Sequence, residues 1–145
     1  MNIEFDKEDL VSLYSYLIEK CNESKKIVNN SNSGLNGDIK SIKNMISNLE
    51  NAYDNVALLD LKNLGEYSKA KIILNSKLLS YTNITGIYSP FTGEANININ
   101  QPLTSMPFTI LHEMAHQRGY ANESEANFLA YIACINNENP YVNYS

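Results

Sequence analysis

The segment Leu111-His112-Glu113-Met114-Ala115-His116 places two histidines four residues apart, with a glutamate directly after the first. On an α-helix, residues i and i+4 lie one turn apart on the same face, so both imidazoles can reach one metal ion. Glu113 can then reach a water molecule bound to that ion. The spacing predicts a catalytic Zn²⁺ centre with His112 and His116 as ligands and Glu113 as general base.

The histidine content of the chain supports this interpretation. The sequence has only two histidines, and both lie in the motif. In the alternative interpretation, both are ordinary core or surface groups and Glu113 makes a salt bridge, which leaves their spacing in a histidine-poor chain unexplained. We therefore expect the helix to bind zinc.

A mononuclear zinc hydrolase needs a third protein ligand, and its fourth position stays open for water. Gly119 can end the motif helix in a left-handed conformation, after which Asn122 can cap a second helix from about Glu123 to Ile135. Two carboxylates lie in the first turn of that helix. We predict Glu125 as the third ligand, because small and apolar residues that suit close packing follow it, with Glu123 as the alternative.

Other assignments for this region compete with the ligand role. Asn122-x-x-Glu125 is also the spacing of a capping box, in which the carboxylate bonds back to the amide of the cap residue. The metzincin pattern would place its third ligand at Asn122 and needs a later methionine, but none follows Met114. Cys134 lies about two and a half turns further along the helix, too far to substitute. A glutamate ligand on a following helix is the gluzincin solution.

The expected chemistry is hydrolysis, above all of a peptide bond. Zinc lowers the pKa of its bound water and polarises the scissile carbonyl, while Glu113 takes the proton of the water and returns it to the leaving amine. A further donor must stabilise the transition state. The candidates are Tyr88, Tyr120, Tyr131 and Arg118, and the sequence does not choose among them.

The motif lies in a segment that favours a buried helix. Thr104 or Ser105 can cap it and Pro107 suits its first turn. Apolar residues follow, and they can bury the helix in a core: Phe108, Ile110, Leu111, Met114 and Ala115. A rigid, buried helix of this kind can hold a metal site in fixed geometry.

Strand-like segments precede the motif at Lys71 to Leu74, Ile84 to Tyr88 and Ala95 to Ile99. We expect a small sheet beside the zinc helix. An edge strand of such a sheet binds an extended peptide in zincins, and Glu94 to Asn98 is the predicted segment; a solvated hairpin is the alternative. Glu94 can line the cleft or cap a turn and is kept outside the catalytic set.

The first half of the chain predicts a helical scaffold. Leu10, Leu13, Leu17 and Cys21 form an apolar stripe on a helix from about Asp9 to Ile27, which we expect to pack against the catalytic helices. A polar loop follows, and a second helix begins at Asp38. The chain is thus expected to be one α+β domain over residues 1–145, mainly helical, with a scaffold over 1–53 and the sheet and site helices over 71–136.

Composition excludes some partners. The chain has 145 residues, 43% hydrophobic content and a net charge of −5 without a large basic cluster, which argues against nucleic acid and anionic lipid as partners. No run is long enough to cross a bilayer. Cys21 and Cys134 lie in apolar helical contexts, which favours buried free thiols, and a single disulfide is the alternative.

Four segments carry a resemblance to a known family: Gly86 to Asn96, Leu103 to Phe108, His112 to Tyr120 and Glu125 to Tyr131. They closely resemble a bacterial zincin-like family catalogued as a domain of unknown function. The resemblance extends from Gly86 to Cys134, about a third of the chain.

The resemblance implies a zincin-like fold and a membrane-anchored protein. Its members look like proteins with transmembrane helices near the N-terminus, followed by an extracytoplasmic metallopeptidase-like domain that continues beyond the end of this chain. It implies His112 and His116 as ligands, Glu113 as base and Glu125 as the carboxylate ligand. The expected partners are thus a peptide or protein substrate, and a membrane reached through segments outside this chain.

Two other functions compete with a peptidase. A zinc-stabilised or degenerate zincin module would bind a peptide or protein partner without cutting it. A hydrolase of amides or cell-wall peptides would use the same zinc chemistry in a cleft of another shape. A structural zinc site fills all four positions with protein groups, so an open water position favours catalysis.

Overall fold

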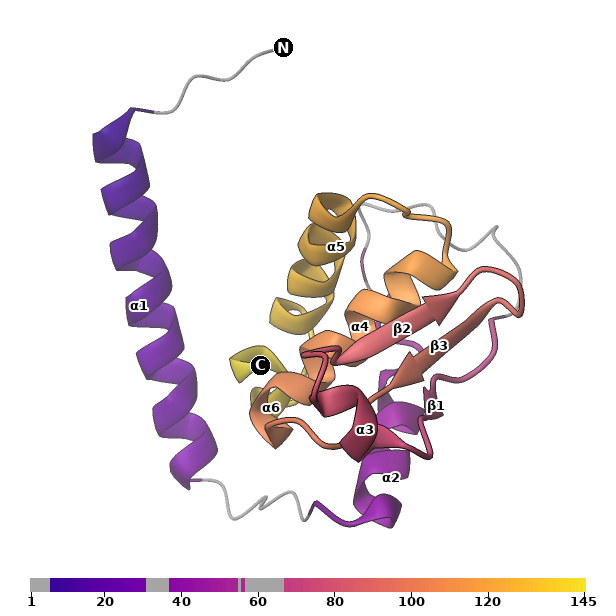
Figure 1. Cartoon of the computed structure of the whole chain (residues 1–145). Helices are drawn as coiled ribbons and strands as arrows, with labels where there is room; N and C mark the ends of the chain where they lie inside the picture. Colours follow the sequence, from indigo (N-terminus) through magenta and orange to yellow (C-terminus); the bar gives the residue numbers. More distant parts are fainter. Residues whose placement is uncertain (1–5, 31–36, 55, 57–66) are drawn as a thin grey trace.

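The computed structural model describes residues 6–30, 37–54, 56 and 67–145. Within these ranges the chain has an α+β fold with six α-helices and one small three-stranded sheet (Figure 1). In chain order the elements are α1 (Lys7–Asn30), α2 (Ile39–Leu49), β1 (Lys71–Ile72), α3 (Ser76–Ser80), β2 (Gly86–Ser89), β3 (Glu94–Ile97), the 3-10 turn η2 (Leu103–Ser105), α4 (Met106–Gln117), α5 (Glu123–Ile135) and α6 (Pro140–Tyr144).

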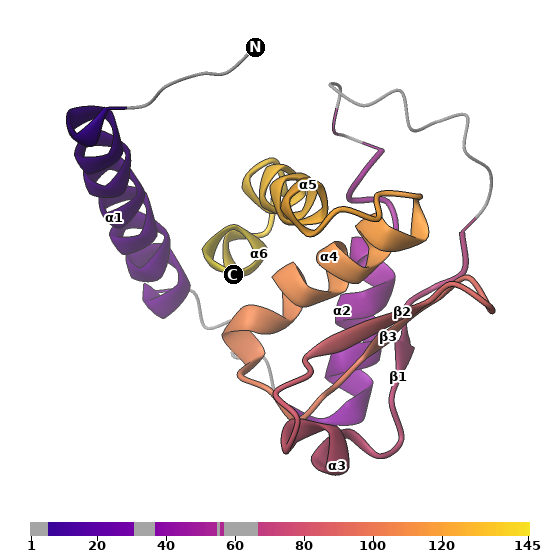
Figure 2. The ribbon, with the colours of Figure 1, turned by 45° about the horizontal axis from the view of Figure 1, so that its top comes forward.

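The strand order β1-β3-β2 places β3 in the centre of the sheet. β1 pairs with β3 in parallel, and β2 pairs with β3 antiparallel, with Tyr88 opposite Ala95. β3 therefore has a neighbouring strand on each side, β2 on one and β1 on the other. The prediction that Glu94 to Asn98 forms an edge strand is wrong. The edge strand beside α4 is β2, which contacts that helix directly (Figure 2).

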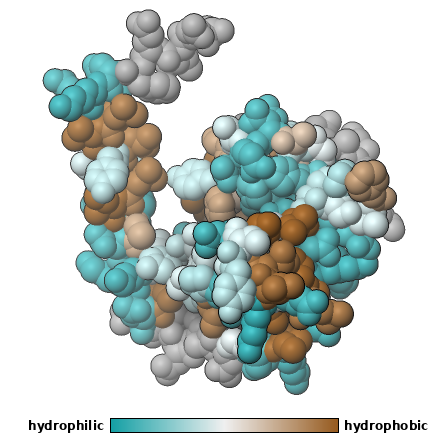
Figure 3. Space-filling view, viewed as in Figure 1, coloured by the Kyte–Doolittle hydropathy of each residue, from teal (hydrophilic) through white to brown (hydrophobic). Residues whose placement is uncertain are grey.

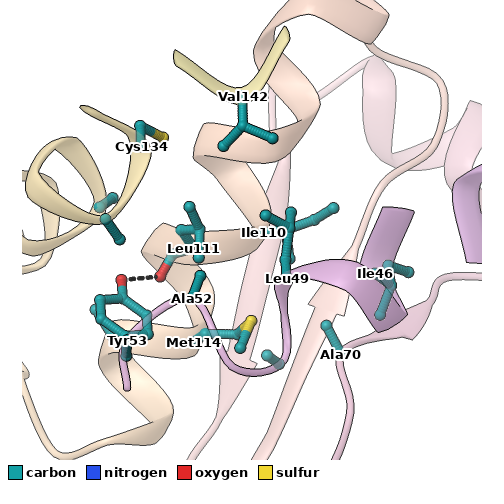
Figure 4. Packing of buried hydrophobic residues seen from close by; sticks show 14 of the residues in the cluster. Ile46, Leu49, Ala52, Tyr53, Ala70, Ile110, Leu111, Met114, Cys134 and Val142 are labelled. Carbon is teal, nitrogen blue, oxygen red and sulfur yellow. Dashed lines mark hydrogen bonds between the residues drawn. The ribbon is translucent and has the colours of Figure 1, made fainter. Parts of the chain in front are cut away.

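α4 is the central element of the fold. The sheet, α2 and α5 all pack against it, and Ile110, Leu111 and Ala115 are fully buried. The Tyr53 hydroxyl donates a hydrogen bond of 2.6 Å to the backbone carbonyl of Leu111, which ties the segment after α2 to this helix (Figure 4). The motif thus lies on a helix that is held from several sides.

Local signals set the ends of the helices. Asp38 caps α2 by accepting a hydrogen bond from the Ser41 amide at 2.8 Å, and Asn122 caps α5 by accepting from Ser124 and Glu125. Gly119 has a φ of 95°, which confirms the predicted left-handed turn after α4. Ser105 occupies the cap position of α4, but its side chain makes no capping bond there.

α1 differs from its prediction. Its apolar stripe does not pack against α4 and α5: Leu10, Leu13 and Leu17 are exposed, and the helix contacts α6 instead. Figure 3 shows apolar surface along α1. Both cysteines are free thiols; Cys134 is buried as predicted, whereas Cys21 is exposed, so the prediction of burial is wrong for Cys21. An apolar stripe indicates a face to bury but does not identify the surface that buries it. None of the helices in the described ranges is long and apolar enough to cross a membrane.

Candidate metal centre

α4 and the first turn of α5 bring two imidazoles and one carboxylate together. The Nε2 atoms of His112 and His116 lie 3.0 Å apart. One oxygen of Glu123 lies 3.2 Å from His112 Nε2, and the other lies 3.5 Å from His116 Nε2. The two imidazoles are mostly buried while Glu123 is largely exposed, so the cluster opens to solvent on the side of α5.

The backbone fixes which nitrogen of His116 is free to bind a metal. Its Nδ1 atom lies 2.7 Å from the carbonyl oxygen of Tyr120, just after the turn at Gly119. Since a carbonyl only accepts, Nδ1 must carry the proton, and a neutral ring then has a lone pair on Nε2. That lone pair faces His112 and Glu123, so the turn after α4 holds His116 in the tautomer that a metal needs.

The surroundings of His112 favour its neutral form. Burial lowers the pKa of His112, and the neighbouring His116 lowers it further, while Glu123 and the side chain of Asn127 act in the opposite direction. Its Nδ1 atom is buried and has no hydrogen-bond partner among the described residues. Phe108 stacks beside the ring, with centroids 6.4 Å apart. A neutral imidazole with a directed Nε2 atom is the form of histidine that binds metals.

The donor set fits a zinc ion. A tetrahedral Zn²⁺ with nitrogen and oxygen ligands at about 2.0–2.2 Å separates its donor atoms by about 3.3–3.6 Å. The distances of 3.0, 3.2 and 3.5 Å among the three side chains are close to that spacing. Two imidazoles and one carboxylate also match a known donor set of catalytic zinc sites with an open fourth position. Small side-chain movements would bring all three donors onto one ion.

In the structure Glu123, and not the predicted ligand Glu125, lies beside the two imidazoles. His112, His116 and Glu123 form the group that can share a cation, and Glu125 is not part of it. The Glu125 amide donates to the Asn122 cap, and among the described residues no hydrogen bond or ion pair holds its exposed carboxylate. The structure therefore favours the alternative ligand of the sequence analysis.

Glu113 lies beneath this group against the edge of the sheet. Its side chain is buried, with 6% exposed. Burial raises the pKa of Glu113 to about 7, with Glu123 adding to the rise, whereas His116 and the backbone amide of Tyr88 lower it. A carboxyl group with a pKa near neutrality can both accept and return a proton at physiological pH.

This shift predicts how the metal-free protein responds to pH. Because the pKa of Glu113 is raised from 4.5 to about 7 on folding, its contribution to stability is complete below pH 4.5 and is lost as the pH rises through 7. Compared with Glu113→Gln, which cannot ionise, wild type should lose on the order of 1–3 kcal/mol of unfolding free energy between pH 4.5 and 8. Urea unfolding of both proteins at the two pH values measures this; parallel profiles would contradict it.

His112, His116 and Glu123 line a cleft of about 810 Å³. β2 and the preceding residues 83–85 line one wall, and α4 with the start of α5 lines the other. Tyr88 is in this wall, and its ring stacks beside His116 with centroids 6.4 Å apart. The cleft therefore joins the edge strand to the candidate metal ligands.

The structure places the four candidate donors for transition-state stabilisation in different surroundings. The Arg118 guanidinium lies over the rings of Tyr53 and Tyr67, at 4.7 and 4.6 Å, in a different hollow. Tyr131 lines a hollow between α1 and α5. Tyr120 contributes its carbonyl to His116. Of the four, Tyr88 alone is among the residues that line the cleft.

Two participants were missed by the sequence analysis. The Tyr120 carbonyl acts through its backbone, and a backbone atom leaves no residue-type signal. The side chain of Asn127 raises the pKa of His112, and Asn127 lines the cleft. Asn127 is four residues after Glu123, and that i, i+4 spacing places both on one helical face. The spacing would have identified it had Glu123 been preferred as the ligand.

Comparison of the chain with curated proteins and with solved structures found no match. The family model described as "Protein of unknown function (DUF3810)" matches residues 1–145. This match covers the whole chain, including every residue of the candidate metal centre. The chain therefore belongs to the DUF3810 family.

Proposed function

We propose that this protein is a zinc-dependent hydrolase, and that its substrate is a peptide. The observation that carries the proposal is the position of two imidazole nitrogens and a carboxylate at separations close to those of a tetrahedral zinc site, next to the buried carboxyl group of Glu113. His112, His116 and Glu123 would hold the ion. Glu113 is not part of that set and is left for proton transfer.

The roles of the protein groups follow from their places. Bound Zn²⁺ would acidify a water molecule and polarise a carbonyl group. Glu113 would accept a proton from the water and hold it on its carboxyl group until the leaving amine takes it. The Tyr88 hydroxyl is the donor that we assign to the transition-state oxyanion, since Tyr88 is in the cleft wall.

The edge strand β2 supports a peptide as substrate. The Asn98 amide donates to the Thr85 carbonyl at 2.9 Å, so Thr85 belongs to a hydrogen-bonded pair of this antiparallel ladder, and Gly86 and Tyr88 belong to non-hydrogen-bonded pairs. The backbone groups of Gly86 and Tyr88 therefore point away from β3, with the Tyr88 amide towards Glu113, on an edge with which no described strand pairs. An extended chain could add to that edge within the cleft.

The test is zinc content in two glutamate variants after reconstitution with zinc. We expect about one zinc per wild-type chain, a large loss in Glu123→Ala and no loss in Glu125→Ala, because of these two carboxylates only that of Glu123 lies near both imidazoles. The two residues lie in the same helical turn, so Glu125→Ala controls for general effects on α5. Equal zinc content in all three proteins would remove Glu123 from the site.

Hydrolysis is measured on the same preparations with a library of unstructured peptides. Cleavage by wild type that follows zinc content across the variants supports the proposal. Stoichiometric zinc without cleavage of any peptide would contradict the hydrolase and favour a module that binds zinc and a partner without catalysis.

A further inference from the structure

The edge strand makes an unusually close approach to the proposed base. A Cβ atom at Gly86 would lie 2.6 Å from Cγ, 2.6 Å from Oε1 and 2.8 Å from Cδ of Glu113. These separations are far inside van der Waals contact, so the Glu113 side chain fills the volume that any other residue would need. Glycine at this position makes room for the carboxylate.

Backbone conformation does not explain this glycine. Among the glycines of the described residues, Gly93 and Gly119 have positive φ values, and Gly86 does not. Gly86 lies in β2 in an ordinary strand conformation, where glycine is an unfavourable choice because it lacks a side chain to pack and raises the entropy of the unfolded chain. Its value to the fold is therefore the space that it leaves.

Neither β2 nor α4 can easily move to make room for a side chain at residue 86. At one end of β2, buried Asn98 bonds to the carbonyls of Thr85 and Ile84, at 2.9 and 2.8 Å. At the other end, the side-chain amide of Gln117, on α4, donates a hydrogen bond of 2.8 Å to the backbone carbonyl of Gly93 in the β2–β3 turn. α4 itself is fixed in the core. An added methyl group must therefore displace the Glu113 side chain.

The displacement would move the reactive group. Two of the three contacted atoms, Cγ and Cδ, lie in the middle of the side chain, so rotation about the last bond cannot relieve the clash and an inner torsion must change. Such a change turns the carboxylate away from its place between β2 and His116. The three atoms nearest to the methyl group all belong to Glu113, and none belongs to His112, His116 or Glu123.

We propose that Gly86 is a positioning residue for Glu113: the missing side chain holds the carboxylate at the cleft, and the metal ligands do not depend on it. The consequence for catalysis rests on the proposed function. The spatial coupling between residues 86 and 113 does not, because it follows from packing alone. The two parts can therefore be tested separately.

The packing part is tested by thermal unfolding of a double-mutant cycle in the metal-free protein. Gly86→Ala should lower the melting temperature by roughly 3–10 °C in the wild-type background. In the Glu113→Ala background, which lacks Cγ, Cδ and Oε1, the same change should shift it by less than about 2 °C. Gly37→Ala is the matched control, because a Cβ there meets only Leu103, at 3.6 Å or more. An equal drop in both backgrounds would overturn the proposal.

The functional part is measured on zinc-loaded protein. Gly86→Ala should keep the zinc affinity within about threefold of wild type, less than the loss expected when a metal's supporting shell is disturbed. Its kcat for peptide hydrolysis should fall on the order of 10²-fold or more. Unchanged kcat would overturn the positioning role. If wild type shows no hydrolysis, the proposed function fails. The double-mutant unfolding cycle still tests whether residues 86 and 113 are coupled by packing. Should Gly86→Ala not fold, recovery of folding in Gly86→Ala/Glu113→Ala supports the coupling, and failure to recover contradicts it.

Discussion

Glu113→Gln should lower the rate of peptide hydrolysis by about 10²–10⁴-fold and leave zinc bound. The amide keeps the size of the side chain, so the close packing against Gly86 is retained. It cannot accept the proton of the attacking water, which is the role that we assign to Glu113. Steady-state kinetics and elemental analysis on the same preparation measure both effects.

Glu125→Gln is the control for this variant, because it makes the same chemical change at an exposed carboxylate outside the candidate metal group. Its activity should equal that of wild type. Full activity in Glu113→Gln would remove Glu113 from the mechanism. Loss of zinc in that variant would instead indicate that the carboxylate supports the metal site.

Leu111→Ala should reduce the free energy of unfolding by about 2–5 kcal/mol, because it leaves a cavity beside α4. Leu111 is fully buried within the motif helix. The hydrogen bond from Tyr53 goes to its backbone carbonyl, so the substitution removes packing and keeps that bond. Urea unfolding of the metal-free protein measures the change.

Leu74→Ala provides the comparison, since the same atoms are removed from a side chain that is 98% exposed. Its unfolding free energy should stay within about 0.5 kcal/mol of wild type. A similar small effect for Leu111→Ala would show that the core around α4 collapses to fill the space.

Helix ends were the most predictable part of the fold because their signals are local. A cap needs one side chain within a few residues of the amides that it binds, as at Asp38 and Asn122. The turn at Gly119 likewise depends on one residue in a left-handed conformation. These features define where α4 ends and α5 begins, and so the distance between the two halves of the candidate site.

The choice between Glu123 and Glu125 as the third candidate ligand depends on geometry that is not local. Glu123 and Glu125 lie two residues apart, so they point in different directions from α5. Which of them faces His112 depends on how α5 crosses α4 after the turn. We used the small residues after Glu125 as evidence, but those residues describe how α5 packs and not which way its first turn faces.

Strand order and the place of α1 were also beyond the sequence signals. The alternation of Asn and apolar residues predicted the strand β3. Its pairing with β1 joins segments more than twenty residues apart, so no local pattern could predict it. The exposed face of α1 shows the same limit, because amphipathicity describes one helix and its contacts depend on another element.

The position of α1 has a consequence for how the protein opens. None of the described side chains of α1 is buried, whereas α4 is enclosed by the sheet and by two helices. We therefore expect amide hydrogens in α1 to exchange through a local opening that costs little free energy, and those in the middle of α4 to exchange much more slowly. The helix that carries His112 and His116 thus belongs to a more protected cooperative unit than α1.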